Sequence, residues 1–159
     1  MAKFIDWKGN WFNSNFELFI EGEQKGTITF STWKSDAEAT LENESYFFKS
    51  VGFWQPKTNI IDQKTNKVVG VITYGNWKFE AIINMESGEL YQWKPTSFWK
   101  SRWLLSNDNN TNMMYSAGKR MCSITADTDN RSLIVAGLFI KQITIDERRQ
   151  LFDKSLIAS

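Results

Sequence analysis

The sequence predicts an all-β protein, a closed antiparallel β-barrel of about 10–12 short strands with a buried hydrophobic helix near the C-terminus. Three observations support this prediction. Short segments of alternating polar and apolar residues recur about every ten residues, with turn-forming residues between them. Aromatic residues make up 15% of the 159 residues, which favours strands over helices. An apolar stretch at 133–140 (LIVAGLFI) follows the last predicted strand and is suited to fill the interior of a closed barrel.

The first predicted hairpin has a strand at 16–20, a polar turn at 21–26 and a strand at 27–30. The same pattern predicts further strands at 37–41, 46–51, 59–62, 68–74, 78–84, 90–93, 103–106, 113–116 and 121–125. No linker interrupts them. We therefore expect one domain over 1–159, with the barrel at 4–128, a central helix at about 130–145 and a tail at 146–159.

A weak internal repeat links two parts of this pattern. The segment 26–34 (GTITFSTWK) resembles the segment 70–78 (GVITYGNWK), and the register persists at Ala37 and Ala81. Two copies of one β-meander explain this similarity better than a solenoid or a propeller, which need more copies.

The terminal segment 133–145 is apolar on every side, so periodicity does not distinguish a buried helix from a pair of buried strands. Its β-branched residues, such as Ile134 and Val135, favour strands. The capping residues at 129–132 favour a helix, which would be ~20 Å long, about the height of a barrel with six-residue strands. We favour the helix. It would be stable only if enclosed, because any exposed side would forfeit burial worth ~25 cal/mol per Å².

The composition indicates a cytoplasmic protein. Cys122 is the single cysteine and cannot form an internal disulfide, and the first residues lack the apolar core and cleavage site of a secretory signal. No apolar run reaches the roughly 20 residues that cross a bilayer. The net charge of +1 gives no global field that would attract nucleic acid, so we expect no nucleic-acid partner.

The sequence carries no recognisable catalytic motif. It has no histidine, and its carboxylates are scattered over turns without the spacing of a catalytic pair. The segment 127–130 (DTDN) has oxygen ligands but lacks the glycine and distal glutamate of an EF-hand, which predicts a turn. Cys122 lies in a predicted strand and is expected to be a small buried hydrophobe. We expect no enzymatic activity, no cofactor and no metal site.

One segment, 93–103 (WKPTSFWKSRW), gathers four large aromatic residues and three cations around a predicted loop. The Trp-Lys pairs that begin at Trp7, Trp33, Trp77 and Trp93 fit strands that turn Trp inward and Lys outward. Within 93–103, the cations can also contact lipid phosphates while Trp lies at the membrane interface. The same residues can also stack on bases and follow a phosphate backbone, or serve as core aromatics flanked by solubilising charges. The candidate ligand-binding residues are Lys94, Trp99, Lys100, Arg102 and Trp103.

The chain resembles the tubby C-terminal-like superfamily, which includes the LURP-one-related and phospholipid-scramblase-like proteins. The segment 60–72 (IIDQKTNKVVGVI) is similar to that family's unit of strand, acidic turn and strand ending in glycine. Asp129 followed by the apolar 133–145 is similar to its closing helix, and the resemblance covers approximately 16–146. It implies a twelve-stranded barrel around a buried C-terminal helix. For function, it implies phosphoinositide head-group binding in some members and a link to membrane lipids in others.

A second resemblance is to the calycins, the lipocalin and avidin-like barrels that carry small molecules. Gly9-Asn10-Trp11 is similar to their Gly-x-Trp signature, in which the Trp plugs one end of the barrel. Such barrels keep their interior open, so the position of 133–145 distinguishes the two resemblances. We expect a non-enzymatic binding module. The ligand that we favour is an anionic lipid head group or a membrane surface. The alternatives are a small apolar ligand inside an open barrel closed by Trp11, and a protein-interaction scaffold with an exposed aromatic patch.

Overall fold

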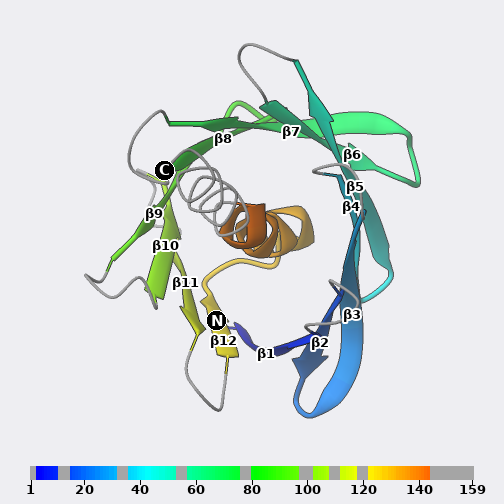
Figure 1. Ribbon diagram of the computed structural model, residues 1–159, viewed down its shortest axis with the longest axis vertical. Helices are drawn as coiled ribbons and strands as arrows, with labels where there is room; N and C mark the ends of the chain where they lie inside the picture. Colours follow the sequence, from blue (N-terminus) through cyan, green and yellow to red (C-terminus); the bar gives the residue numbers. More distant parts are fainter. Residues whose placement is uncertain are drawn as a thin grey trace, which may run out of the picture.

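The predicted fold class is confirmed. A computed structural model describes residues 3–10, 15–31, 36–52, 57–75, 80–96, 102–107, 112–117 and 122–143 of the chain. These residues form twelve antiparallel strands that close into a barrel, and one helix at 131–143 lies inside it (Figure 1). The strands are β1 (Lys3–Asn10), β2 (Asn15–Ile20), β3 (Glu23–Phe30), β4 (Ala37–Leu41), β5 (Glu44–Val51), β6 (Lys57–Asp62), β7 (Lys67–Tyr74), β8 (Ala81–Met85), β9 (Leu90–Pro95), β10 (Arg102–Ser106), β11 (Asn112–Ala117) and β12 (Cys122–Ala126).

The barrel is an up-and-down meander. Each strand pairs with the next one in sequence, and β12 pairs with β1 to close the ring. Odd-numbered strands therefore all run toward one end of the barrel, and even-numbered strands run back from it. We call the end at which β1, β3, β5, β7, β9 and β11 finish the loop end, and the opposite end, where Lys3 lies, the turn end.

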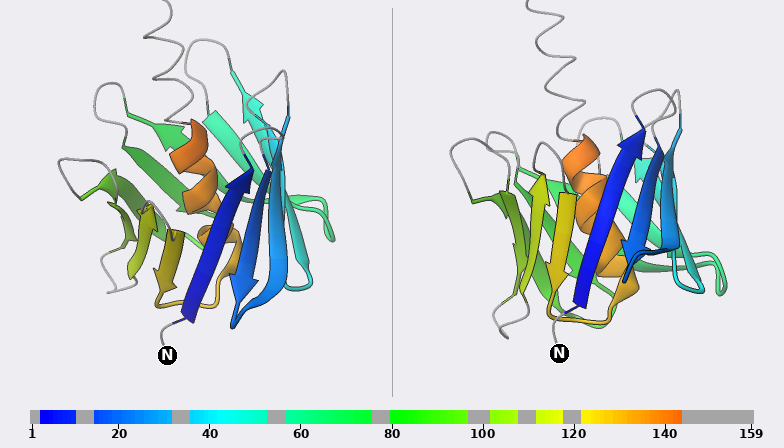
Figure 2. Two further views of the ribbon diagram at one scale, coloured as in Figure 1. Left: turned by 60° about the horizontal axis from the view of Figure 1, so that its bottom comes forward. Right: turned by 90° about the horizontal axis from the view of Figure 1, so that it is seen from below.

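The helix runs along the inside of the barrel from the turn end toward the loop end (Figure 2). All residues from 132 to 141 are buried, and the apolar surface of 133–140 meets the barrel wall on every side. Asn130 caps its start: the Asn130 Oδ1 accepts hydrogen bonds from the backbone N–H of Leu133 (3.4 Å) and from Ser132 Oγ (2.6 Å). The expected helix, rather than a pair of strands, is confirmed within 131–143.

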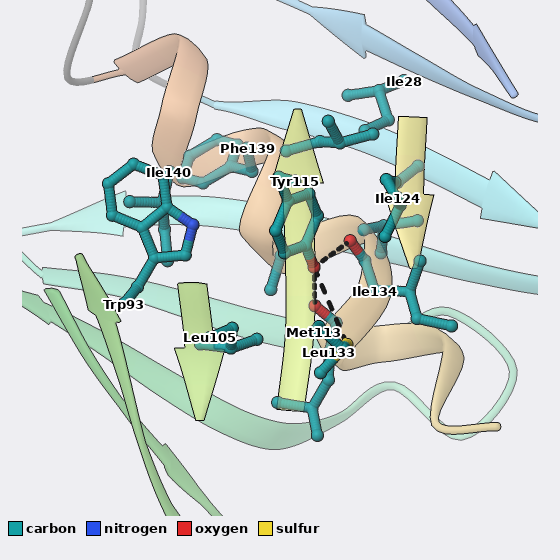
Figure 3. Packing of buried hydrophobic residues seen from close by; sticks show 14 of the residues in the cluster. Ile28, Trp93, Leu105, Met113, Tyr115, Ile124, Leu133, Ile134, Phe139 and Ile140 are labelled. Atoms are coloured by element: carbon teal, nitrogen blue, oxygen red, sulfur yellow. Dashed lines mark hydrogen bonds between the residues drawn. The ribbon is translucent and has the colours of Figure 1, made fainter. Parts of the chain in front are cut away.

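Tyr115 on β11 fixes the helix against the wall (Figure 3). Its hydroxyl donates to the carbonyl oxygen of Ile134 at 2.9 Å and lies 3.3 Å from that of Leu133. Gly137 makes this approach possible, because a Cβ there would lie 2.2 Å from both Cζ and Oη of Tyr115. A glycine one turn after these carbonyls thus lets a large wall side chain reach the helix backbone.

Two details of the predicted strands are wrong. The expected turn at 21–26 is only two residues long, because Glu21 (φ 53°) and Gly22 (φ 82°) both adopt the positive φ of a tight hairpin turn, and β3 already begins at Glu23. The prediction also omits β1, although its alternation is regular: Ile5 and Trp7 are buried, whereas the Asp6 and Lys8 side chains are exposed.

The internal repeat corresponds to equivalent strands. Its two copies begin in β3 and β7, at Gly26 and Gly70. Each glycine lies beside an irregularity in the ladder to the preceding strand, between Leu18 and Phe19 in one copy and between Ile60 and Ile61 in the other. The sequence match therefore relates β3 to β7, and the strand pairs β2–β3 and β6–β7 share this irregularity of register.

Candidate functional site

The predicted binding residues that the structure describes lie on the neighbouring strands β9 and β10. Lys94 and Arg102 are exposed on the outer face near the loop end; Lys94 lies opposite Leu104, and the Arg102 carbonyl accepts a 2.9 Å hydrogen bond from the Thr96 N–H. Trp103 points into the barrel and is 6% exposed. The structure thus brings the two cations to one outer surface and places Trp103 on the inner face of the same sheet. Trp99 and Lys100 lie outside the described residues.

Trp103 contributes to an aromatic cage around Lys141, which the sequence analysis missed. The Lys141 Nζ lies 4.5 Å from the ring centroid of Trp7, 5.5 Å from that of Trp103 and 5.9 Å from that of Phe16. Trp103 also stacks on Trp93, with 6.1 Å between ring centroids. A desolvated cation over an aromatic face gains about 2 kcal/mol. The Lys141 cage (Trp7, Phe16 and Trp103) therefore ties the later part of the helix to β1, β2 and β10. The one sequence signal for it is a lysine within the apolar run.

The sequence joining the strands at the loop end is unusual in composition. Six segments connect these strand ends, and they lie outside the described residues: 11–14, 32–35, 53–56, 76–79, 97–101 and 118–121. In sequence, they contain five tryptophans: Trp11, Trp33, Trp54, Trp77 and Trp99. They also contain five cations: Lys34, Lys78, Lys100, Lys119 and Arg120. None of the six contains Asp or Glu. This combination of Trp and cations is the one that suits an anionic lipid interface.

The turn end is acidic. Nine described carboxylates lie there: Glu21, Glu23, Glu42, Glu44, Asp62, Glu86, Glu89, Asp127 and Asp129. Five described cations lie there: Lys3, Lys25, Lys64, Lys67 and Arg131. The excess of carboxylates gives this end a net negative charge, although the whole chain has a charge of +1.

Glu42 is the centre of an ion-pair network at the turn end. It accepts hydrogen bonds from Lys3 Nζ on β1 and from Arg131 Nη2 on the helix, the latter at 3.0 Å. The hydrogen bond from Lys3, which has the larger effect, and the hydrogen bond from Arg131 lower the pKa of the Glu42 carboxyl below its ordinary value. The network joins the first strand, the β4–β5 turn and the start of the helix.

The helix occupies the interior that a ligand-carrying barrel would keep open. Hollows formed by the described residues lie at the ends of strands instead. One of about 150 Å³ is lined by β7, β8 and β9 residues that include Tyr74, Ile82 and Lys94. Another, an open one of about 440 Å³, lies at the turn end between Lys3 and Glu42.

The described residues offer little for acid–base or metal chemistry. They contain no group of three His, Cys, Asp or Glu side chains placed to hold a metal ion. Burial raises the pKa of Tyr115, and burial together with a hydrogen bond to the Glu89 carboxylate raises the pKa of Tyr91 to about 12, so both phenols stay protonated at neutral pH. Cys122, which was expected to be buried, is half-buried and packs against the core.

Comparison of the chain with protein-family models, with curated proteins and with solved structures finds no match. No helix within the described ranges is long and apolar enough to span a membrane.

Proposed function

We propose that this barrel is a non-enzymatic binding module whose loop end engages an anionic lipid surface. One observation carries the proposal: the exposed Lys94 and Arg102 lie at the end of the barrel whose connecting sequences hold five Trp and five cations but no carboxylate. Lys and Arg near an anionic bilayer gain about 1 kcal/mol each, and Trp prefers the interface between water and hydrocarbon.

The tubby-like resemblance supports the same proposal. A twelve-stranded barrel around a C-terminal helix is the architecture that this resemblance implies, and some members of that superfamily bind anionic head groups. Membership in the superfamily is part of our proposal. In the cytoplasm, where we propose that the protein acts, the inner leaflet supplies the anionic lipids.

The filled interior weighs against the alternative ligand, a small apolar molecule inside the barrel. Phe139 stacks on Phe30 of β3 and Phe48 of β5, with ring centroids 5.7 Å and 4.6 Å apart. Leu133, Ile134 and Ile140 are fully buried. A ligand in this space would have to displace the helix.

Co-sedimentation with vesicles tests the proposal. The protein is mixed with vesicles of phosphatidylcholine alone or with phosphatidylserine, at low and moderate salt. We expect binding that requires phosphatidylserine and weakens with salt. In a Lys94→Glu/Arg102→Glu variant, the loss of two cations should weaken binding by at least about 30-fold.

The matched control is Lys64→Glu/Lys67→Glu, which makes the same change in net charge at the turn end. It should bind nearly as well as the wild type, because these lysines lie away from the proposed surface. Equal loss in both double variants would mean that only net charge matters, and absence of binding to either vesicle would contradict the proposal.

A further inference from the structure

The outer face of the barrel carries a small hollow across β7, β8 and β9, near the loop end. It is the hollow of about 150 Å³, and its exposed lining residues form two rows across the three strands. The rows are Thr73, Ile82 and Gln92, and, one step nearer the loop end, Gly75, Glu80 and Lys94. Because Gly75 has no side chain, one of the six outward positions is open. A side chain would fit there, since a Cβ on Gly75 would lie 3.4 Å from the Glu80 carbonyl oxygen, an ordinary contact distance.

Two opposite charges lie side by side at this hollow without pairing. Ala81 is the cross-strand partner of Trp93, which places Glu80 beside Lys94 at the next outward position. Both side chains are exposed, and neither forms an ion pair with another residue of the described ranges. Side chains that face each other across antiparallel strands have Cβ atoms about 4.5–5.5 Å apart. The hollow therefore offers a carboxylate and an ammonium to a ligand that carries both charges close together.

The internal repeat shows that the fold does not require this arrangement. At an offset of 44 residues, the second copy has Gly75, Glu80 and Ile82 where the first has Ser31, Asp36 and Glu38. The backbone is the same in both copies: the Gly75 N–H donates to the Glu80 carbonyl at 2.8 Å, and the equivalent first-copy distance is 2.9 Å. In the first copy, however, the carboxylate accepts a 2.8 Å hydrogen bond from the Ser50 N–H. The second copy differs by an open position, an unpaired carboxylate and an apolar residue, Ile82, that is 37% exposed.

We propose that this hollow binds the head group of phosphatidylserine and thereby selects this lipid among the anionic ones. The inference rests on the proposed function, in which Lys94 contacts lipid. The serine head group has a primary ammonium separated from its phosphate by two carbons. Glu80 accepts hydrogen bonds from that ammonium, Lys94 donates to the phosphate, and Ile82 contacts the carbons between them.

The carboxylate of Glu80 supplies the selectivity. Hydrogen bonds between two charged groups are roughly twice as strong as those between neutral groups. Phosphatidylglycerol has the same phosphate but offers Glu80 only hydroxyl groups, and the trimethylammonium of phosphatidylcholine has no N–H to donate. Beside an anionic lipid without an ammonium, the Glu80 carboxylate is repelled by the phosphate, which disfavours the wrong head group.

The test compares two sets of vesicles, in which phosphatidylserine or phosphatidylglycerol supplies the same surface charge in phosphatidylcholine. We expect the wild type to bind the phosphatidylserine vesicles several-fold more tightly. Glu80→Gln should make the two affinities equal, because it removes the group that recognises the ammonium. The ratio of the affinities is the readout, since loss of a carboxylate changes binding to both anionic vesicles. Glu86→Gln, which removes a carboxylate at the turn end, should keep the preference.

A second pair of variants tests the hollow itself. Gly75→Val places a side chain in the open position and should also abolish the preference. Ser31→Val makes the corresponding change in the first copy and should keep it. Thermal unfolding shows whether each variant is folded.

Equal binding of both vesicles by the wild type, or a preference that persists in Glu80→Gln and Gly75→Val, would overturn the inference and leave the proposed function standing. Free O-phosphoserine, titrated into isotope-labelled protein and followed by NMR, separates the lipid from a soluble ligand with the same group. If it binds at the hollow while the two vesicles are bound equally, the ligand is the soluble molecule and the inference fails. Absence of binding to either vesicle would remove the proposed function, and the inference with it.

Discussion

At the scale of single residues, Gly137 and Tyr115 show how the helix fits its barrel. Tyr115 is fully buried and reaches the helix backbone through space that only a glycine leaves free. Glycine costs a helix about 1 kcal/mol relative to alanine, so its presence here is explained by packing and not by helix propensity.

Gly137→Ala should therefore destabilise the protein, by about 2–3 kcal/mol, because the new Cβ overlaps the Tyr115 ring. Propensity alone would predict a gain of about 1 kcal/mol, so the sign of the change decides between the two effects. Urea unfolding followed by circular dichroism measures it. A stabilised Gly137→Ala variant would show that the Tyr115 contact is absent in solution.

The sequence predicts some residue positions and misses others for a physical reason. Alternation along a strand predicts that Trp7 and Trp93 are buried while Lys8 and Lys94 are exposed, and the structure confirms all four. The Lys141 cage was not predictable. Its three rings come from β1, β2 and β10, and which strands face one side of an enclosed helix depends on how the barrel closes.

At the scale of elements, the helix is the best-predicted part of the chain. Its length and capping residues identified it, and its uniformly apolar surface required a site enclosed on all sides. β1 is missing from the predicted strands, although it is as long as β3, β5 and β7 and alternates regularly. Its position in the barrel is set by pairing with β12, from the far end of the chain, which no local pattern reports.

The link between helix and wall at the turn end makes stability depend on pH. Lys3 and Arg131 lower the pKa of Glu42 in the folded protein below its unfolded value of about 4.5. The ionised Glu42 therefore stabilises the fold above about pH 4.5. This stabilisation is lost as the pH falls from there through the lower pKa of the folded state. Glu42→Gln should cost about 1 kcal/mol at neutral pH and progressively less as the pH is lowered below about 4.5 toward about 3. Urea unfolding at both pH values measures the difference.

The matched control is Glu86→Gln, which removes a carboxylate at the same end that takes no part in its ion pairs. It should leave stability nearly unchanged at both pH values. A cost for Glu42→Gln that is as large at about pH 3 as at neutral pH would argue against an electrostatic role and for a packing role.

At the scale of the whole molecule, the sequence predicted a barrel but could identify only one part of the candidate surface. The segment 93–103 stood out locally, and the structure describes its Lys94 and Arg102 as exposed. The five other Trp-rich or cationic segments are scattered from 11 to 121, and the internal repeat, which relates 32–35 to 76–79, does not show at which end of the barrel they lie. Only the meander order, in which alternate connections join strands at the same end, shows that they share a loop end with 93–103.

The proposed binding of lipid by the loop end predicts a particular salt dependence. Strands of about six residues hold the turn end ~20 Å from a surface that touches the loop end. The Debye length is about 8 Å at 0.15 M salt and about 30 Å at 0.01 M, so the distal carboxylates are screened from the lipid in the first case and not in the second. Glu21→Gln/Glu86→Gln should therefore bind phosphatidylserine vesicles like the wild type at about 0.15 M, and more tightly at about 0.01 M.

Lys94→Gln/Arg102→Gln should weaken binding at both concentrations, because these cations lie at the surface. Vesicle titrations at the two salt concentrations make the comparison. Tighter binding of the Glu21→Gln/Glu86→Gln variant already at the higher concentration would place the turn end near the membrane and contradict binding through the loop end.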